Sequence, residues 1–308
     1  MGADGMEKRI IEGIIVPLLT PVTAEEKPCF SQLEGLTDYV IAGGVNAIFA
    51  NGTTGEFARF TQEERARILA CIVKKAGGRV PVIAGVSDCG TRMVIENIRW
   101  AEDAGADAVV TTLPYYFPMT SVKEQIDFIT DVTAATPLPV FLYNIPAAVG
   151  CGISRQALDA VCGIDNLCAV KDTSGKPEVI DWLKERYGDS LKIFVGDERL
   201  NYYGLSHGAD GLVPSLANPF PRILARAWEA AGRQDWAACR RHCGLVDEMN
   251  GLNRFSDSWM SPNIWRKEAL AQMGIMDSTF TRPYNPVGRE EKRTIAGYIQ
   301  RYREEYGD

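Results

Sequence analysis

The segment Leu167-Cys168-Ala169-Val170-Lys171-Asp172-Thr173-Ser174-Gly175 joins an apolar run to a lysine and then to a polar turn that ends in glycine. An apolar run of this length, followed at once by turn residues, is typical of a buried strand. Its lysine side chain either packs along apolar surface with its ammonium group in water, or places its amine in a site from which water is excluded. A desolvated amine can attack a carbonyl carbon and form a Schiff base. The residues at the ends of the other predicted strands help to decide between these interpretations.

Apolar, β-rich runs recur along the chain at a regular spacing, and a helical pattern follows each of them. This alternation is typical of parallel strands joined by crossover helices. Three candidate capping boxes mark helix starts, at 31–34, 61–64 and 121–124. The sequence predicts eight strands, at residues 13–19, 45–50, 81–86, 107–111, 139–143, 167–171, 192–195 and 211–213.

Eight strand and helix repeats within about 230 residues match the size of a closed (β/α)8 barrel. We therefore predict an α/β fold: a (β/α)8 TIM barrel over residues 1–232 with a C-terminal helical appendage over 233–308. Three helices predicted at 236–250, 262–273 and 290–306 form the appendage, and no Gly/Ser-rich or Pro-rich linker separates them from the barrel. An open doubly wound sheet is the alternative architecture. It is disfavoured because no G-x-G-x-x-G motif follows the first strand and no P-loop is present.

The composition is that of an ordinary globular chain, with 308 residues, 46% hydrophobic content and a net charge of −7. The acidic balance and the lack of a lysine/arginine block argue against nucleic acid or an anionic membrane as the main partner. Because no apolar run approaches 18 residues, we expect a cytoplasmic protein. Its eight scattered cysteines are expected to be reduced. Cys239, His242 and Cys243 fall in a predicted surface helix and lack a fourth ligand, so no metal site is predicted.

The active site of such a barrel is built from the loops that follow the strands. At these positions the sequence has hydroxyls, phenols, carboxylates and one amine. They belong to Asn51-Gly52-Thr53-Thr54-Gly55-Glu56, Tyr115-Tyr116, Tyr143-Asn144, Lys171, Gly196-Asp197-Glu198 and Pro214-Ser215.

These residues allow both a structural and a chemical interpretation. The Gly-Thr-Thr-Gly turn can be a plain strand–helix connection, or it can bind a small carboxylate through backbone N–H and hydroxyl donors. Tyr143 can be a half-buried aromatic at a strand end, or a proton relay beside the amine. Asp197 and Glu198 can be the solvated start of a helix, where carboxylates are favoured.

Several spaced motifs make the chain resemble a known family over nearly its whole length. The family is that of the pyruvate-dependent class I aldolases typified by dihydrodipicolinate synthase and N-acetylneuraminate lyase. The motifs are Pro17-Leu-Leu-Thr-Pro21, Gly52-Thr-Thr-Gly-Glu56, Pro114-Tyr-Tyr116, Tyr143-Asn-Ile-Pro146, Val170-Lys171 and Gly208-Ala-Asp-Gly211.

The resemblance implies a role for each matching residue. Lys171 would be the Schiff-base lysine, Tyr143 the acid/base relay, and Thr53 with Thr54 the binders of the pyruvate carboxylate. Tyr116 would be the second tyrosine, which dihydrodipicolinate synthases lend to the relay of a neighbouring subunit. The resemblance also implies a homo-oligomer, a dimer or homotetramer, that acts on a small 2-keto acid without a metal or an organic cofactor.

One departure from the family pattern bears on the substrate. Dihydrodipicolinate synthases hold the carboxylate of aspartate semialdehyde with an arginine two residues after the proline of the Tyr-Asn-x-Pro motif, and Ala148 stands there in this chain. Losing a charge-assisted bidentate anchor of this kind should cost about 1.5–3 kcal/mol or more. The nearest cationic residues in sequence, Arg155 and Lys176, are seven or more positions away.

Other positions are similar to the sialic-acid lyases, in which a polar pocket holds a sugar chain. The motif Asn144-Ile-Pro-Ala147 resembles theirs. The substrate-binding residues expected beside Thr54 are Thr173, Asp197, Glu198, Val213 and Ser215. The match is not complete, because Gly-Thr-Thr-Gly replaces the Gly-Ser-Thr-Gly of those lyases, and the residues from Lys171 to Gly175 look more like those of sugar-acid aldolases.

The expected function is therefore a Schiff-base aldolase or lyase that cleaves a 2-keto-3-deoxy sugar acid to pyruvate and an aldehyde. Two alternatives use the same Schiff base: a keto-deoxy sugar acid dehydratase, and a 4-hydroxy-tetrahydrodipicolinate synthase that condenses pyruvate with aspartate semialdehyde. A barrel that binds a keto acid without converting it is a further alternative. Loss of Lys171, Tyr143 or the Thr53-Thr54 pair would favour that alternative, and all are present.

Overall fold

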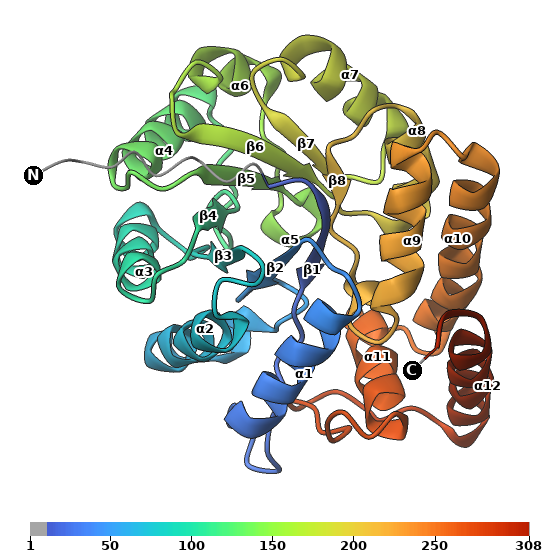
Figure 1. Cartoon of the computed structure of the whole chain (residues 1–308). Helices are drawn as coiled ribbons and strands as arrows, with labels where there is room; N and C mark the ends of the chain where they lie inside the picture. The colour runs from blue at the N-terminus through green and yellow to red at the C-terminus, as the bar shows by residue number, and fades with distance from the viewer. Residues whose placement is uncertain (1–10, 308) are drawn as a thin grey trace, which may run out of the picture.

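The computed structural model describes residues 11–307. Its eight strands form a closed parallel barrel in chain order, and the pairing of Gly13 with Gly211 joins the last strand to the first (Figure 1). The predicted (β/α)8 fold is confirmed. The strands are β1 Gly13–Pro17, β2 Ala47–Ala50, β3 Val82–Gly85, β4 Ala108–Thr111, β5 Val140–Asn144, β6 Leu167–Asp172, β7 Lys192–Val195 and β8 Gly211–Leu212.

Helices surround the barrel as the alternating pattern predicts. Those between and after the strands are α1 Phe30–Ala42, α2 Gln62–Ala76, α3 Thr91–Asp103, α4 Val122–Ala134, α5 Pro146–Val149, α6 Arg155–Val161, α7 Pro177–Tyr187, α8 Asn201–Ser206 and α9 Pro221–Gly232. The short 3₁₀ turns are η1 Phe57–Arg59, η2 Glu198–Leu200, η3 Ser215–Ala217 and, beyond these helices, η4 Asn250–Arg254. The four-residue α5 is an element that the sequence pattern did not predict.

The barrel interior is a packed core, because successive strand residues point alternately to the helices and to the barrel axis. Inward-facing side chains include Ile15, Phe49, Ile83, Val110, Phe141, Ala169 and Phe194. Phe141 and Phe194 stack with ring centroids 5.6 Å apart. Lys171 lies two residues after Ala169 on β6, and the same alternation turns its side chain toward the axis at the carboxyl end of the barrel.

The helix starts agree with two of the three candidate capping boxes. At α2 the box is complete, because Thr61 Oγ1 accepts from Glu64 N at 3.2 Å and Glu64 Oε2 accepts from Thr61 N at 2.9 Å. The side chain of Ser121 caps α4. The prediction for Ser31 is wrong: α1 begins at Phe30 with Cys29 as its N-cap residue, which places Ser31 inside the first turn.

Thr61→Ala is expected to lower the free energy of unfolding by about 1 kcal/mol, because the variant leaves an N-terminal backbone N–H of α2 without its acceptor. Urea unfolding at fixed protein concentration, followed by circular dichroism, measures the change. Thr61→Ser keeps the hydroxyl and serves as the control. Equal unfolding midpoints for the alanine and serine variants would contradict this account of α2.

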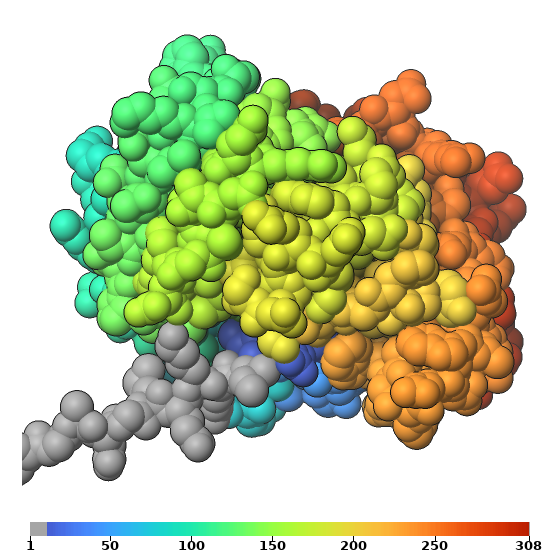
Figure 2. Space-filling view, turned by 90° about the horizontal axis from the view of Figure 1, so that it is seen from above, coloured from blue at the N-terminus to red at the C-terminus, as the bar shows by residue number. Residues whose placement is uncertain are grey.

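The C-terminal helices α10 Trp236–Met249, α11 Ser261–Gln272 and α12 Arg289–Tyr306 lie along one side of the barrel (Figure 1). Figure 2 shows these orange and red residues on the side opposite the cyan and green ones. α10 packs on α9, and α11 contacts α12 and η3. These contacts bring η4 and α11 to the end of the barrel where Lys171 lies.

The prediction that Cys239, His242 and Cys243 occupy a surface helix is wrong for their side chains, which are buried. His242 Nδ1 forms a 2.6 Å hydrogen bond with Tyr306 Oη. Over residues 11–307 the structure has no cluster of three His, Cys, Asp or Glu side chains suited to a metal ion. In the same range, no helix combines the length and the apolar character that crossing a membrane requires.

Candidate active site

Lys171 ends the predicted buried strand and is itself buried, with 6% of its surface exposed. Its Nζ lies 3.7 Å from the centroid of the Tyr143 ring and 5.2 Å from that of Phe49. Among residues 11–307 no carboxylate oxygen forms an ion pair with it. The Lys171 amine is therefore buried inside the barrel mouth beside two aromatic rings and does not reach water, as the interpretation of Lys171 as a nucleophile requires.

Hydrogen bonds between neighbouring strand ends hold Lys171 beside Tyr143. The two residues pair across β5 and β6, as do the next two, Asn144 and Asp172. Asn144 Nδ2 donates to Asp172 Oδ2 at 2.6 Å, and Ser174 Oγ donates to Asp172 Oδ1 at 2.6 Å. The carboxylate of Asp172 is thereby occupied by local donors.

Gly196, after β7, leaves the space that the Lys171 side chain occupies. A Cβ atom at this glycine would lie 2.2 Å from Thr173 Oγ1 and 2.7 Å from Lys171 Cε. Both distances are far below an ordinary van der Waals contact. The loops after β6 and β7 can approach this closely only because residue 196 has no side chain.

The Gly52-Thr-Thr-Gly-Glu56 turn follows β2 at the same end of the barrel. Glu56 has a left-handed backbone (φ 59°), and its N–H donates to Thr53 O at 3.0 Å. Gly55 is required by close approach, since a Cβ there would lie 2.9 Å from Leu18 O. Asn263 Nδ2, from α11, donates to Thr54 O at 2.9 Å.

The side chain of Glu56 fixes this turn to the C-terminal part of the chain. Glu56 Oε1 forms a buried ion pair with Lys267 Nζ at 2.5 Å, and Glu56 Oε2 accepts from Thr281 Oγ1 at 2.6 Å. The two threonines of the turn are therefore positioned from both the barrel and the appendage.

A cavity of about 440 Å³, here called the lysine cavity, opens at this end of the barrel. It is lined by nine of the ten predicted site residues, namely Thr53, Thr54, Tyr143, Lys171, Thr173, Asp197, Glu198, Val213 and Ser215. Thr173 Oγ1 is buried and, within the described range, has no hydrogen-bond partner. A hydroxyl of this kind beside the amine is suited to a polar group of a bound molecule.

Each of the two neighbouring acids in this cavity is neutralised by an arginine. Arg199 Nε and Nη2 donate to the two oxygens of Asp197 at 2.9 and 2.6 Å. Burial alone would raise the pKa of the Asp197 carboxyl, but the hydrogen bonds from Arg199 hold that pKa below its ordinary value. Glu198 is paired with the buried Arg266 at 2.6 Å. Glu198 is only 9% exposed, so of the interpretations left open by the sequence, the solvated helix start does not apply to it.

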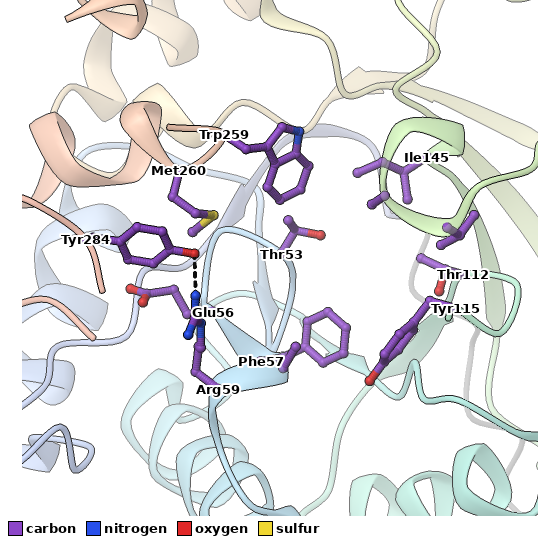
Figure 3. A pocket seen from close by; sticks show the side chains of 13 residues that line it. Thr53, Glu56, Phe57, Arg59, Thr112, Tyr115, Ile145, Trp259, Met260 and Tyr284 are labelled. Atoms are coloured by element: carbon purple, nitrogen blue, oxygen red, sulfur yellow. Dashed lines mark hydrogen bonds between the residues drawn. The ribbon is translucent and has the colours of Figure 1, made fainter. Parts of the chain in front are cut away.

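A second, largely apolar cavity of about 180 Å³, here called the aromatic cavity, adjoins the first. Figure 3 shows Trp259, Met260 and Tyr284 on one side of it and Phe57, Tyr115 and Ile145 around the other, with Thr53 between them. Burial raises the pKa of the Tyr115 phenol. The two cavities share Thr53, Ile145, Trp259 and Met260.

Tyr116 is the predicted site residue that lines neither cavity. Its side chain is 82% exposed, and its ring meets the exposed Phe117 edge to face at 5.0 Å. Its backbone is left-handed, with φ 77°. Within one chain Tyr116 does not meet Tyr143, so the role implied for it in a neighbouring subunit stays a prediction.

Several residues that line the lysine cavity were not predicted from the sequence. Most come from the segment between α10 and α11 and from α11 itself: Asn250, Asn253, Ser258, Trp259, Met260, Pro262, Asn263 and Arg266. Strand-end reasoning could not find them, because they follow no barrel strand. The available signal was local: the segment 250–259 has two asparagines and two serines and ends on Trp259.

Comparisons with known proteins show the family to which the chain is similar. Residues 10–302 match the model of the dihydrodipicolinate synthetase family. The chain is 33% identical over 300 residues to a 4-hydroxy-tetrahydrodipicolinate synthase of Sorangium cellulosum, covering 96% of this chain and 97% of that protein. It is 32% identical over 241 residues to an uncharacterized DapA-like lyase of Halobacterium salinarum, covering 78% of each.

A solved structure is similar over the same length. The chloride-inhibited dihydrodipicolinate synthase from Acinetobacter baumannii, complexed with pyruvate, is 26% identical with a TM-score of 0.87, covering 95% of this chain and 99% of that one. A (β/α)8 barrel with a buried lysine and tyrosine at its mouth, and these relatives, define an enzyme of the lyase type. The chain belongs to the dihydrodipicolinate synthetase family, which confirms the resemblance noted in the sequence.

Proposed function

We propose that this enzyme cleaves a 2-keto-3-deoxy sugar acid into pyruvate and an aldehyde through a Schiff base on Lys171. The observation that carries the proposal is the lining of the lysine cavity beyond the amine. That lining offers the hydroxyls of Thr173 and Ser215 and two acids whose charges are balanced by Arg199 and Arg266. A charge-balanced wall of donors and acceptors suits a neutral chain of hydroxyl groups.

In the proposed reaction, the neutral amine of Lys171 adds to C2 of the keto acid, and loss of water gives a protonated imine. A base removes the proton of the C4 hydroxyl, the C3–C4 bond breaks, and its electron pair moves to the imine, which becomes an enamine. The aldehyde leaves. Protonation of C3 and hydrolysis of the imine then release pyruvate and restore the amine.

Tyr143 is the proposed proton relay, because its ring lies against Lys171 Nζ and its phenol is the nearest acid/base group on β5. Thr53 and Thr54 are the proposed binders of the substrate carboxylate, since their turn presents hydroxyl and backbone donors to the cavity. Thr173, Asp197, Glu198, Val213 and Ser215 are the proposed neighbours of the hydroxyl chain. No external cofactor enters this chemistry.

Pyruvate and borohydride test the Schiff base directly. We expect reduction to trap pyruvate on Lys171, and peptide mass spectrometry to locate the adduct there. The same protein is then assayed for pyruvate release from 2-keto-3-deoxy sugar acids of five to nine carbons. An adduct spread over exposed lysines, or none, would rule out the proposal and favour a barrel that binds a keto acid without converting it.

A second candidate function is the synthase that condenses pyruvate with aspartate semialdehyde. Two observations favour it: the Sorangium relative is named for this activity, and Arg59 lines the aromatic cavity together with Ala148. Against it, Arg59 already donates to Tyr284 Oη at 2.7 Å and to Arg282 O at 3.1 Å. Consumption of pyruvate with aspartate semialdehyde, without pyruvate release from any sugar acid, would establish the synthase.

A dehydratase would form the same Schiff base and expel a hydroxyl in place of an aldehyde. Product analysis separates the two, because cleavage yields pyruvate and dehydration keeps all the carbons of the substrate together. We also propose a cytoplasmic homo-oligomer in which the exposed Tyr116 reaches the relay of a neighbouring subunit. Analytical ultracentrifugation of the intact protein gives its oligomeric state.

A further inference from the structure

Arg266 is a fully buried cation that connects the C-terminal appendage to the lysine cavity. Its exposed fraction is 1%, and it lies on α11, outside the barrel strands. Arg266 Nη2 donates to Glu198 Oε2 at 2.6 Å and to Asn250 Oδ1 at 2.9 Å. A buried guanidinium is costly unless it is paired and hydrogen-bonded, and Glu198 and Asn250 provide these partners for Arg266.

The Glu198 side chain also accepts two further hydrogen bonds from the loop after β8. Its Oε1 accepts from Ser215 Oγ at 2.9 Å and from Leu216 N at 2.8 Å. A serine hydroxyl has one hydrogen to donate, and here that hydrogen is directed to the carboxylate. Toward the cavity, Ser215 therefore offers only the lone pairs of its oxygen, and Glu198 offers its remaining acceptor position.

We propose that Arg266 is a positioning residue that sets Glu198 and Ser215 as hydrogen-bond acceptors, so that the cavity selects a neutral, hydroxyl-bearing end of the substrate over an anionic end. This inference rests on the proposed function and adds a residue outside the barrel strands that sets which end group of the substrate the cavity accepts. A hydroxyl can donate to both acceptors. A carboxylate or phosphate has no proton to donate at neutral pH and would leave both acceptors without a hydrogen bond.

The first test compares Schiff-base formation at Lys171 with binding of the opposite, hydroxyl-bearing end of the substrate, here called the far end. In Arg266→Gln we expect pyruvate trapping on Lys171 to stay within twofold of the parent protein. KM for a six-carbon 2-keto-3-deoxy acid that ends in hydroxymethyl should rise at least tenfold, with a smaller change in kcat. Arg266→Lys should restore part of the lost affinity. Arg301→Gln, which removes an exposed cation of the appendage, is the matched control.

The second test uses Glu198→Gln and needs no change at the buried arginine. This variant leaves a buried positive charge beside Ser215 and an amide that can donate. We expect the ratio of kcat/KM for the hydroxymethyl-terminated acid to that for its carboxylate-terminated analogue to fall at least tenfold. If Arg266→Gln does not fold, the double variant Glu198→Gln, Arg266→Met replaces it in the test. The double variant removes both charges of the pair and so keeps the site neutral.

The outcomes separate this inference from the proposed function. A parent protein that traps no pyruvate would overturn the Schiff-base proposal itself. A parent that traps pyruvate, with KM in Arg266→Gln within twofold of its value, would overturn the inference alone. Loss of trapping in a folded Arg266→Gln protein, or an unchanged substrate ratio in Glu198→Gln, would also overturn the inference, because Arg266 would then not act on the far end selectively.

Discussion

Replacement of Lys171 by alanine is expected to lower turnover of the 2-keto acid substrate by a factor on the order of 10⁴ or more, because the variant has no amine to form the imine that accepts electrons. The fold should be retained, since the side chain makes no ion pair within the described part of the chain. Steady-state pyruvate release, coupled to lactate dehydrogenase, measures the loss.

Lys176→Ala is the matched control, because that lysine follows the same segment and is exposed. It should keep the activity and the borohydride adduct of the parent protein. Activity in Lys171→Ala within a factor of ten of the parent would mean that another residue provides the nucleophile. The Schiff-base assignment would then be abandoned.

Gly196→Ala is the second change with a large expected effect. Its added Cβ would meet Thr173 Oγ1 at 2.2 Å and Lys171 Cε at 2.7 Å, so one of the two loops must move. Overpacking of this kind costs about 1–3 kcal/mol of stability. A displacement of the amine by about 1 Å can lower kcat/KM by about 10²-fold. Trapping with pyruvate and urea unfolding measure the two effects.

Gly163→Ala controls for the general effect of adding a methyl group at a glycine. A Cβ there would have no atom within 4 Å, and we expect changes below about 0.5 kcal/mol. If Gly196→Ala behaved like Gly163→Ala in both measurements, the close packing between residue 196 and the lysine would not be a requirement of the site.

The sequence predicted the features of fold and site that depend only on the residues of one strand and the loop that follows it. Each barrel strand is a short apolar run, and the strand-end rule then brought Lys171, Tyr143 and the Thr53-Thr54 turn to one cavity without knowledge of any contact. These inferences required only the direction and periodicity of each strand.

Features that depend on distant parts of the chain could not be predicted in this way. Glu198 looked like the solvated start of a helix, because nothing near it in sequence reveals its pairing with Arg266, 68 residues later. The capping box predicted at Ser31 was wrong for a local reason. The N-cap residue of α1 is the extended Cys29, two residues before the serine that the motif assigns to that position. The partner of Tyr116, and the division of the chain at residue 232, stay predictions.

Two consecutive residues of α11 bear on whether the barrel can exist alone. Arg266 and Lys267 are the counter-ions of Glu198 and Glu56, two buried carboxylates on different barrel loops. Removing one partner of a buried pair costs about 3–5 kcal/mol, and a typical domain has only about 5–15 kcal/mol of stability in total. A chain truncated before α11 would lose both cations at once. We therefore expect that the eight-stranded unit does not fold without α11, and that the appendage contributes to its stability as well as to the lining of the lysine cavity.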